Sequence, residues 1–195
     1  MRIGIDARFL GPAGTGIGRY TQRLLENLEQ IDKENEYSVF LRRENFNLYK
    51  TANRNFRKVL ADIPWYGIRE QTTLPGIFKR EELDLLHALH FNVPILYRGK
   101  FVVTIHDLIK TDWGGRGATT KSPLEYQVKR LGYHLVIRSA VGRAKKILTP
   151  SNYVKNRVVE VFGVDPGKVV VTYEAGTLLG KGRTAVERKV EDVLG

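Results

Sequence analysis

The 195-residue sequence contains no cysteine, which excludes disulfides, thiolate metal sites and cysteine nucleophiles together. This absence also favours a reducing compartment. No apolar run approaches the ~20 residues that a membrane-spanning helix needs. The amino-terminal stretch MRIGIDARFL has mixed charge and lacks the apolar core of a secretory signal. We therefore expect a cytoplasmic protein that is either free in solution or bound at a membrane surface.

Positive charge is abundant and unevenly distributed. The net charge is +11, and residues 110–168 hold twelve Lys or Arg against four Asp or Glu. This stretch is either a solvated surface, a site for substrate phosphates, or a contact for acidic lipid headgroups. Nucleic acid is disfavoured, because the sequence contains no recognised binding motif and its aromatic residues are not interleaved with the basic ones.

Short β-prone runs alternate with helical patterns along the chain. We expect strands at 2–6, 37–41, 57–63, 83–89, from 101, at 145–151 and at 168–173, and helices from 17, within 66–82, after 123 and at 153–162. Such alternation predicts an α/β fold, a Rossmann-like doubly wound, mainly parallel sheet with helices on both faces. Ligands of such sheets bind at the carboxyl ends of the strands.

Details of three helices are also predicted. The long helix after residue 123 is expected to place Leu124, Val128, Leu131, Leu135 and Ala140 on one face. Ser151 is expected to cap the helix at 153–162, and Gly163 to end it. The pattern at 185–194 resembles a further amphipathic helix with no obvious partner in the main domain. We therefore assign residues 1–176 to one domain and 177–195 to a linker that leads toward another.

A glycine-rich turn from Gly11 to Tyr20 is the first candidate site. Gly14, Gly16 and Gly18, with Thr15 between them, let backbone N–H groups approach an anion at a helix amino terminus, and Arg19 adds a positive charge. The dinucleotide fingerprint is not met, because Arg19 stands where its third glycine belongs. NAD is therefore disfavoured. The alternative is a tight turn that binds nothing.

His106 and Asp107 form the second candidate site, at the carboxyl end of the strand that begins at Phe101. Side chains at that end emerge into a cleft, and a neutral histidine can bind a sugar hydroxyl near pH 7. The alternative is a histidine bonded to nearby loop backbone. Ser151 also lies at this edge, either as a helix cap or with its hydroxyl toward a ligand, whereas nothing in the sequence decides the roles of Trp65 and Trp113.

Histidines after the preceding strand raise a metal-hydrolase alternative. His87 and His90 are expected near His106, Asp107 and Asp6 around one opening. Their HALH spacing is not a recognised zinc signature, so this alternative is less favoured.

Six segments, taken in order, resemble the amino-terminal domain of family 4 glycosyltransferases. They are RIGIDARFL, GTGIGRYTQRLLENL, DLLHALHFNVP, VVTIHDLI, AKKILTPSNYVKNRV and FGVDPGKVVVTYEAG. The resemblance runs from Met1 to about Gly176. No single motif is decisive, but the glycine turn, the strand that ends in His-Asp and the Pro-Ser-x-Tyr helix start appear in the order that the family shows.

The resemblance implies one half of a GT-B fold and retaining transfer of a sugar from a nucleotide diphosphate donor, without metal or other cofactor. In the family the glycine turn lies near the donor phosphate and sugar, which matches Gly14, Thr15, Gly16, Gly18 and Arg19. The histidine matching His106 contacts the transferred sugar, so we expect it to be catalytic. The amino-terminal domain chiefly binds the acceptor, for which we name Asp107, Lys110 and Ser151.

The resemblance also implies partners. They are a nucleotide-sugar donor, a glycan or lipid-linked acceptor, and a membrane surface docked on the basic segment 110–146, at the inner face of the plasma membrane. The family's donor-binding glutamates have no counterpart in this sequence. We therefore expect a mannosyl- or glucosyltransferase domain that is inactive without a donor-binding domain. The alternative is a non-catalytic module that binds an anionic glycan or lipid phosphate.

Overall fold

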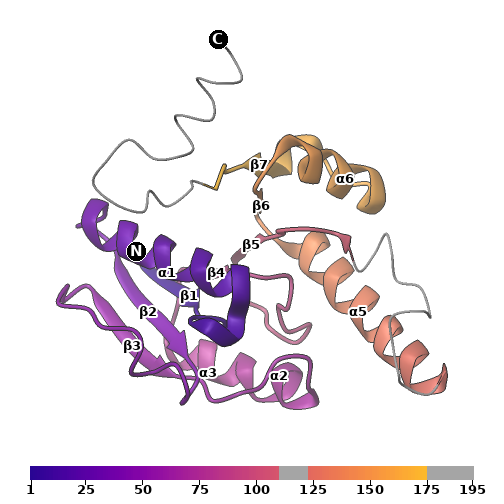
Figure 1. The fold of residues 1–195 in the computed structure, drawn as a ribbon. Helices are drawn as coiled ribbons and strands as arrows, with labels where there is room; N and C mark the ends of the chain where they lie inside the picture. The colour runs from indigo at the N-terminus through magenta and orange to yellow at the C-terminus, as the bar shows by residue number, and fades with distance from the viewer. Residues whose placement is uncertain (110–122, 175–195) are drawn as a thin grey trace, which may run out of the picture.

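Seven short strands form one sheet in the computed structural model, which describes residues 1–109 and 123–174 (Figure 1). The strands are β1 (Arg2–Asp6), β2 (Glu36–Leu41), β3 (Phe56–Leu60), β4 (Leu85–Ala88), β5 (Phe101–Thr104), β6 (Ile147–Thr149) and β7 (Val169–Val171). All neighbouring strands pair in parallel. The predicted α/β class and parallel sheet are confirmed.

Helices connect these strands. They are α1 (Thr15–Ile31), α2 (Ile68–Thr72), α3 (Leu74–Arg80), α5 (Pro123–Arg143) and α6 (Asn152–Phe162), with short 3-10 turns at Pro12–Gly14 and Pro166–Lys168. In Figure 1, α1 lies on one side of the strands and α2 and α3 lie on the other. Within the described part of the chain, no helix is both long and apolar enough to cross a membrane.

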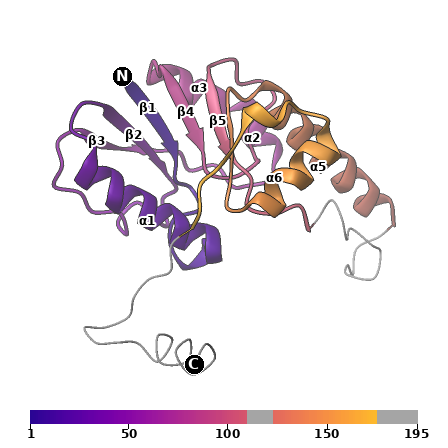
Figure 2. The ribbon, with the colours of Figure 1, turned by 90° about the horizontal axis from the view of Figure 1, so that it is seen from above.

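The strand order β3-β2-β1-β4-β5-β6-β7 reverses direction between β1 and β4 (Figure 2). The register places Asp6, the last residue of β1, opposite Ala88, the last residue of β4. The loops that follow these two strands therefore leave the same edge of the sheet and diverge there. Such a switch point is where parallel α/β sheets bind ligands.

Two apolar clusters cover the two faces of the sheet. Leu25 of α1 packs with Ile5, Val39 and Leu41 on one face. The other cluster is larger and collects buried side chains from α3, α5 and α6, among them Phe78, Ile137 and Val158. Because successive side chains of a strand point to opposite faces, Phe40 joins the second cluster between two neighbours that join the first.

The single helix predicted within 66–82 is wrong in detail, because two helices occupy this stretch. Pro75 lies in the first turn of α3, where its missing N–H costs nothing, but within a continuous helix that N–H would be needed. The chain therefore ends α2 at Thr72 and begins again at Leu74. The predicted ends of α6 are confirmed: Ser151 accepts a bond from Val154 N, and Gly163 is left-handed with φ 64°.

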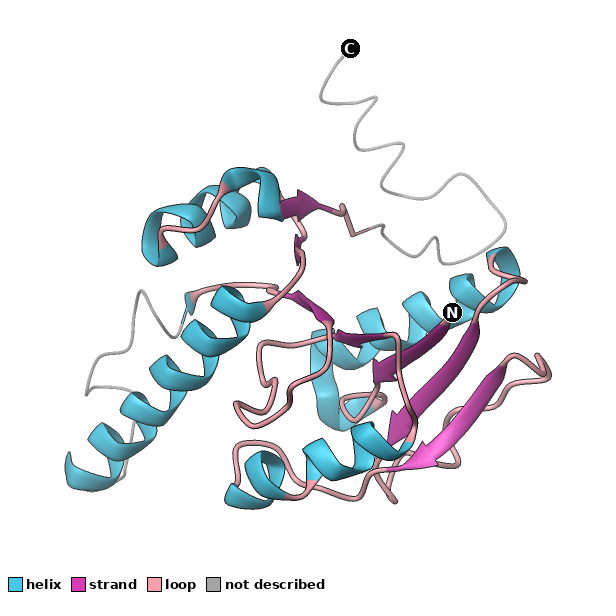
Figure 3. Cartoon of the chain, turned by 180° about the vertical axis from the view of Figure 1, so that it is seen from behind, coloured by secondary structure: helices cyan, strands magenta, loops and turns pink. Residues whose placement is uncertain are grey.

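The predicted apolar face of α5 is wrong. Ala140 is buried beside Ile137, but Val128, Leu131 and Leu135 have 63%, 62% and 54% of their surface exposed. Figure 3 shows α5 extending beyond the strands at the end farthest from β6. At 100° per residue, the three exposed positions lie on the side of the helix opposite Ile137 and Ala140, which pack in the core. Helical spacing identified apolar positions there without identifying a surface to bury them. The segment 177–195 lies outside the described residues, so the domain boundary at 176 stays a prediction.

Candidate active site

The glycine turn and His106 lie at the same edge of the sheet. The turn follows the end of β1 at Asp6, and His106 comes two residues after the end of β5 at Thr104. Tyr20, in the first part of α1, packs edge-on against the His106 imidazole with 4.8 Å between ring centroids and 80° between ring planes. The structure thus brings together the two groups that the sequence predicts for one site.

Hydrogen bonds hold the His106 ring in one orientation. Nε2 lies 3.0 Å from the backbone carbonyl oxygen of Leu89, and Nδ1 lies 3.0 Å from a carboxylate oxygen of Glu174. The side chain keeps 15% of its surface exposed, so it is not enclosed by aliphatic neighbours. A bond to loop backbone was the structural alternative for this histidine, and the bond to Leu89 is of that kind. The ring is therefore positioned by the loop after β4 and still reaches the surface.

A polar chain behind His106 ties α1 to the two neighbouring strands. The Tyr20 hydroxyl hydrogen-bonds the side chain of Thr104; burial raises the pKa of Tyr20, and this bond partly offsets the rise. The Thr104 hydroxyl in turn lies 2.9 Å from His87 Nε2. His87 is itself within the strand β4 and is buried. These contacts fix the face of α1 against which His106 packs.

His87 gives the protein a specific loss of stability in acid. Burial, with a smaller contribution from His106, lowers the pKa of His87 to about 4, whereas an unfolded histidine has a pKa near ~6.5. Between these values the unfolded chain binds a proton that the folded chain does not, so stability falls as pH falls. We expect His87 to cost about 2 kcal/mol of unfolding free energy between pH 7 and pH 5.

Urea unfolding at both pH values measures this cost. His87→Gln keeps an amide that can bond Thr104 but does not titrate, so the variant should lose about 2 kcal/mol less than the natural protein over this interval. If both proteins lost the same unfolding free energy between pH 7 and pH 5, His87 would not be the source of the acid sensitivity.

The glycines of the turn have different roles. A Cβ added to Gly14 would lie 1.7 Å from the carbonyl oxygen of Phe9, and one added to Gly18 would lie 2.2 Å from that of Gly11. These two glycines therefore allow α1 to pack directly on the loop backbone. A Cβ on Gly16 would meet no atom within 4 Å. Only Gly16 leaves open space at the helix start.

The rest of the turn is exposed and partly strained. Thr15 has φ 50°, a region that few residues other than glycine adopt, and such strain often accompanies a functional site. Gly14 caps α1 without a side-chain hydrogen bond, so no side chain occupies the first N–H groups. Arg19 is exposed. Thr15 and Gly16 are exposed as well, although the Thr15 N–H already donates to the carbonyl of Pro12. The predicted anion site thus combines an exposed helix start with an exposed positive charge.

Alanine substitutions separate the packing glycines from the open one. Gly14→Ala is expected to lower the unfolding free energy by about 3 kcal/mol, because backbone must move to admit the methyl group. Gly16→Ala should leave it unchanged or raise it by up to ~1 kcal/mol, since alanine favours helix. Thermal or urea unfolding of both variants measures the difference. Equal destabilisation would show that Gly14 does not pack more tightly than Gly16.

A buried ion cluster supports this edge of the sheet, and sequence analysis missed it. Arg8 is fully buried and donates to both carboxylate oxygens of Asp6 at 2.8 Å. It also donates to Glu70 of α2 at 2.8 Å and to the carbonyl of Ile63 at 3.1 Å. Burial alone would lower the pKa of Arg8, but the charges and bonds of Asp6 and Glu70 outweigh it and raise that pKa. The cluster joins the loops after β1 and β3 to α2.

An aromatic stack lies beside the ion cluster. Phe9 stacks on Trp65 with 4.3 Å between ring centroids and 8° between planes. The Arg42 guanidinium lies over the Trp65 ring, 5.0 Å from its centroid. Trp65, whose role the sequence left open, therefore packs the loop after β3 against the start of the glycine turn.

The remaining predicted site residues have simpler surroundings. Asp107 is exposed and accepts a bond from the backbone N–H of Ile109 at 3.0 Å. The Ser151 hydroxyl accepts from Val154 N at 3.3 Å as a helix cap. Lys110 and Trp113 lie outside the described residues. The roles of Asp107, Lys110 and Ser151 in acceptor binding stay predictions.

The structure does not bring together the residues that the metal-hydrolase alternative requires. His87 is committed to Thr104 within the sheet, Asp6 is committed to Arg8, and His90 packs against Phe91 with 4.0 Å between ring centroids. In residues 1–109 and 123–174, no three His, Asp or Glu side chains are placed to hold one ion.

Curated and solved proteins resemble this chain over most of its length. It is 21% identical over 181 residues to the O-antigen chain mannosyltransferase RfbU of Salmonella typhimurium strain LT2, a match that covers 85% of this chain and 46% of that protein. The chain thus spans about half the length of this relative.

Solved structures of the wall teichoic acid polymerase TagF share the fold. A histidine-to-alanine variant matches with a TM-score of 0.52 at 11% identity, over 87% of this chain and 37% of the polymerase. A histidine-to-asparagine variant matches with a TM-score of 0.50 at 10% identity and the same coverage. At this identity the likeness concerns the fold alone, in which this chain is one Rossmann-like half.

The family model described as Glycosyltransferase Family 4 matches residues 14–175. This span includes the glycine turn from Gly14 onward, the end of β5 with His106, and the start of α6. The chain therefore belongs to glycosyltransferase family 4.

Proposed function

We propose that this chain is the acceptor-side half of a retaining hexosyltransferase, which moves mannose or glucose from a nucleotide diphosphate sugar to a glycan or lipid-linked acceptor. The single observation that carries the proposal is the contact between Tyr20 and His106, because it joins the helix that follows the glycine turn to the histidine at the end of β5. A mannosyltransferase among the relatives supports the choice of sugar.

The donor phosphates lie over the start of α1. The helix dipole and the backbone N–H groups of its first turn favour negative charge there, and the open space at the exposed Gly16 lets phosphate oxygens approach the backbone. Gly14, Thr15 and Gly18 shape this turn, and Arg19 supplies a charge that can pair with phosphate.

The transferred sugar lies against the His106 imidazole. The Leu89 carbonyl holds one ring nitrogen, Nε2, and so orients the ring. The other nitrogen, Nδ1, bonds a sugar hydroxyl in place of the Glu174 carboxylate, and preorganised polar groups contribute most when charge develops in the transition state. We assign acceptor binding to Asp107, Lys110 and Ser151. No metal or other cofactor takes part.

A lipid-linked acceptor is reached from the membrane surface through the segment 110–146. Its described part exposes Val128, Leu131 and Leu135 on α5, together with Arg130 and Arg138. Exposed apolar side chains beside arginines favour contact with anionic headgroups. This contact places the enzyme at the inner face of the plasma membrane.

Transfer requires a donor-binding half in addition to this chain, as the coverage of 46% of RfbU supports. The test supplies purified chain with nucleotide diphosphate sugars of mannose and glucose, with and without its donor-binding half, and measures sugar transferred to acceptor. We expect turnover only when both halves are present. Full turnover by the chain alone would refute the two-half requirement, and binding of anionic glycan without any transfer by both halves would favour the non-catalytic module.

A further inference from the structure

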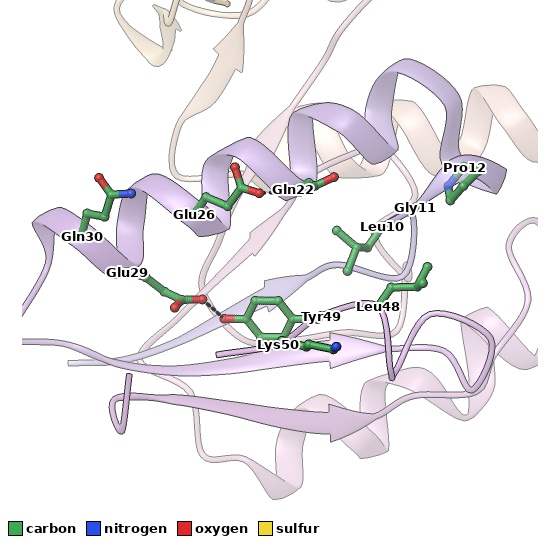
Figure 4. Close-up of a pocket in the computed structure, with 10 residues that line it drawn as sticks. All are labelled: Leu10, Gly11, Pro12, Gln22, Glu26, Glu29, Gln30, Leu48, Tyr49 and Lys50. Atoms are coloured by element: carbon green, nitrogen blue, oxygen red, sulfur yellow. Dashed lines mark hydrogen bonds between the residues drawn. The ribbon is translucent and has the colours of Figure 1, made fainter. Parts of the chain in front are cut away.

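A concave site lies on α1, on the side away from His106. It is a groove of about 590 Å³ between α1 and residues 48–50, closed at one end by residues 10–12 (Figure 4). This volume falls within the range of small-molecule sites. We propose that the groove binds a neutral oligosaccharide. In the enzyme, this would be the part of the acceptor glycan beyond the sugar that reacts; that identity rests on the proposed function, but the binding itself does not.

The groove and the candidate active site use different sides of α1. At 100° per residue, Gln22, Glu26 and Glu29 lie roughly 180–240° around the helix from Tyr20. The buried face that contains Thr21 and Leu25 lies between the two sides. The two sites therefore flank the helix and are joined through residues 10–12, which include the first residues of the glycine turn.

The wall opposite α1 is fixed in place. The buried Asn45 amide donates to the carbonyls of Arg8 at 3.0 Å and Leu10 at 3.1 Å. Gly11 has φ 95°, and a Cβ there would lie 2.7 Å from a methyl group of Leu48. Glycine at this position therefore lets Leu48 sit directly on the loop. A preformed groove loses little ordering entropy when a ligand binds.

Two hydrogen bonds to Glu29 hold the bottom of the groove in one conformation. The Glu29 carboxylate accepts from the Tyr49 hydroxyl at 2.6 Å and from the Thr51 hydroxyl at 2.8 Å. Figure 4 shows this Tyr49 ring between α1 and Leu48, with its hydroxyl turned toward Glu29. Glu29 thus builds the floor, and the groups left to face a ligand are those above it.

The groups that can face a ligand match the hydroxyls and the apolar C–H face of a sugar ring. Gln22 and Gln30 are exposed amides. The Gln22 amide donates one N–H to Glu26 at 2.8 Å, and its second N–H and carbonyl oxygen can bond a ligand. Gln30 can likewise donate and accept hydrogen bonds, as sugar hydroxyls do. Across the groove, Leu48 keeps 57% of its surface exposed and supplies an apolar surface that suits the C–H face of a hexose. Polar groups on one wall and apolar groups on the other favour a saccharide over a purely apolar ligand.

The charges of the groove favour a neutral ligand. Its lining holds Glu26, Glu29 and Lys50, and Glu26 is paired with Arg23 at 2.7 Å. The groove therefore carries little net charge in a protein of net charge +11. Phosphate-bearing ligands gain little here and are attracted to the start of α1 instead. The anionic groups of the substrates and the neutral part of the glycan are thus separated on the two sides of the helix.

Binding of neutral tetrasaccharides to the purified chain tests the proposal. The probes are α-linked mannotetraose and maltotetraose, followed by amide chemical shifts in two-dimensional NMR. We expect at least one probe to shift the resonances of Gln22, Gln30 and Lys50 in a saturable way. Gln22→Ala should weaken this binding about fivefold, the usual worth of one hydrogen bond.

Asn27→Ala is the matched control, because Asn27 is an exposed amide on α1 outside the groove lining and should leave the affinity unchanged. Failure of both probes to shift the groove at their solubility limits would overturn the proposal. Shifts confined to Gly16 and His106 would also overturn it while supporting the acceptor-side function. Saturable groove binding in a protein whose two halves show no transfer would uphold the groove and refute that function.

Discussion

Replacing Arg8 with methionine is expected to lower the unfolding free energy by about 3–5 kcal/mol, because it leaves two carboxylates buried without their partner. Arg8 has none of its surface exposed, and Asp6 and Glu70 keep 5% and 1%. The guanidinium is the only cation that the structure places in contact with both acids, as far as the described residues show. Urea unfolding at pH 7 measures the loss.

Two further variants test whether the loss of stability comes from unpaired buried charges. Arg23→Ala removes an ion pair with Glu26 in which both side chains are largely exposed, so it should cost less than 1 kcal/mol, as is usual at the surface. Adding Asp6→Asn and Glu70→Gln to Arg8→Met removes the buried charges and should recover part of the loss. An Arg8 variant as stable as the Arg23 variant would show that the cluster is not buried in solution.

Substitution of His106 by alanine is expected to lower kcat for sugar transfer about 10²–10³-fold when both halves of the enzyme are present, the usual loss for one preorganised donor. The acceptor KM should change little, because the ring is proposed to contact the transferred sugar. Steady-state kinetics with varied acceptor separate the two constants.

His134→Ala is the control for the His106 experiment, since His134 lies on α5 away from the end of β5 and should leave kcat unchanged. His106→Gln keeps a hydrogen-bond donor and should restore part of the activity. A His106→Ala enzyme with kcat within twofold of the natural one would remove this histidine from the reaction. A loss of folding, seen by circular dichroism, would assign it a structural role instead.

Local patterns predicted the sheet because each strand carries its own signal. The run at Phe101–Thr104 is apolar and β-branched, as in a strand covered on both faces, and its end placed His106 at the carboxyl edge. Parallel pairing then required the glycine turn after β1 to share this edge. The site could thus be outlined from two local patterns and one topological rule.

Interactions between distant residues could not be predicted in this way. Glu70 stands 62 positions from Arg8, and Glu174 stands 68 positions from His106. No local spacing relates such pairs, and a lone arginine after a strand resembles any surface arginine until its partners are placed. The signal available was weak: a charged residue within the apolar stretch Ala7–Leu10 is unusual unless it is paired.

Tertiary context also decided which apolar residues are buried. Leu135 is 54% exposed and Ala140 is fully buried, because five residues separate them by about 140° around α5. The side of α5 that carries Ala140 packs on the core, together with Tyr133 and Val136, and the side that carries Leu135 does not. The groove on α1 escaped prediction for a similar reason, since it needs residues 48–50 to fold back beside the helix.

The most direct test of the account is a crystal structure of both halves of the enzyme with an unreactive nucleotide diphosphate sugar bound. We predict the diphosphate over the backbone N–H groups at Gly16 and the sugar within hydrogen-bond distance of the His106 imidazole. A donor bound at the amino-terminal edge of the sheet, or with its sugar turned away from His106, would contradict the account.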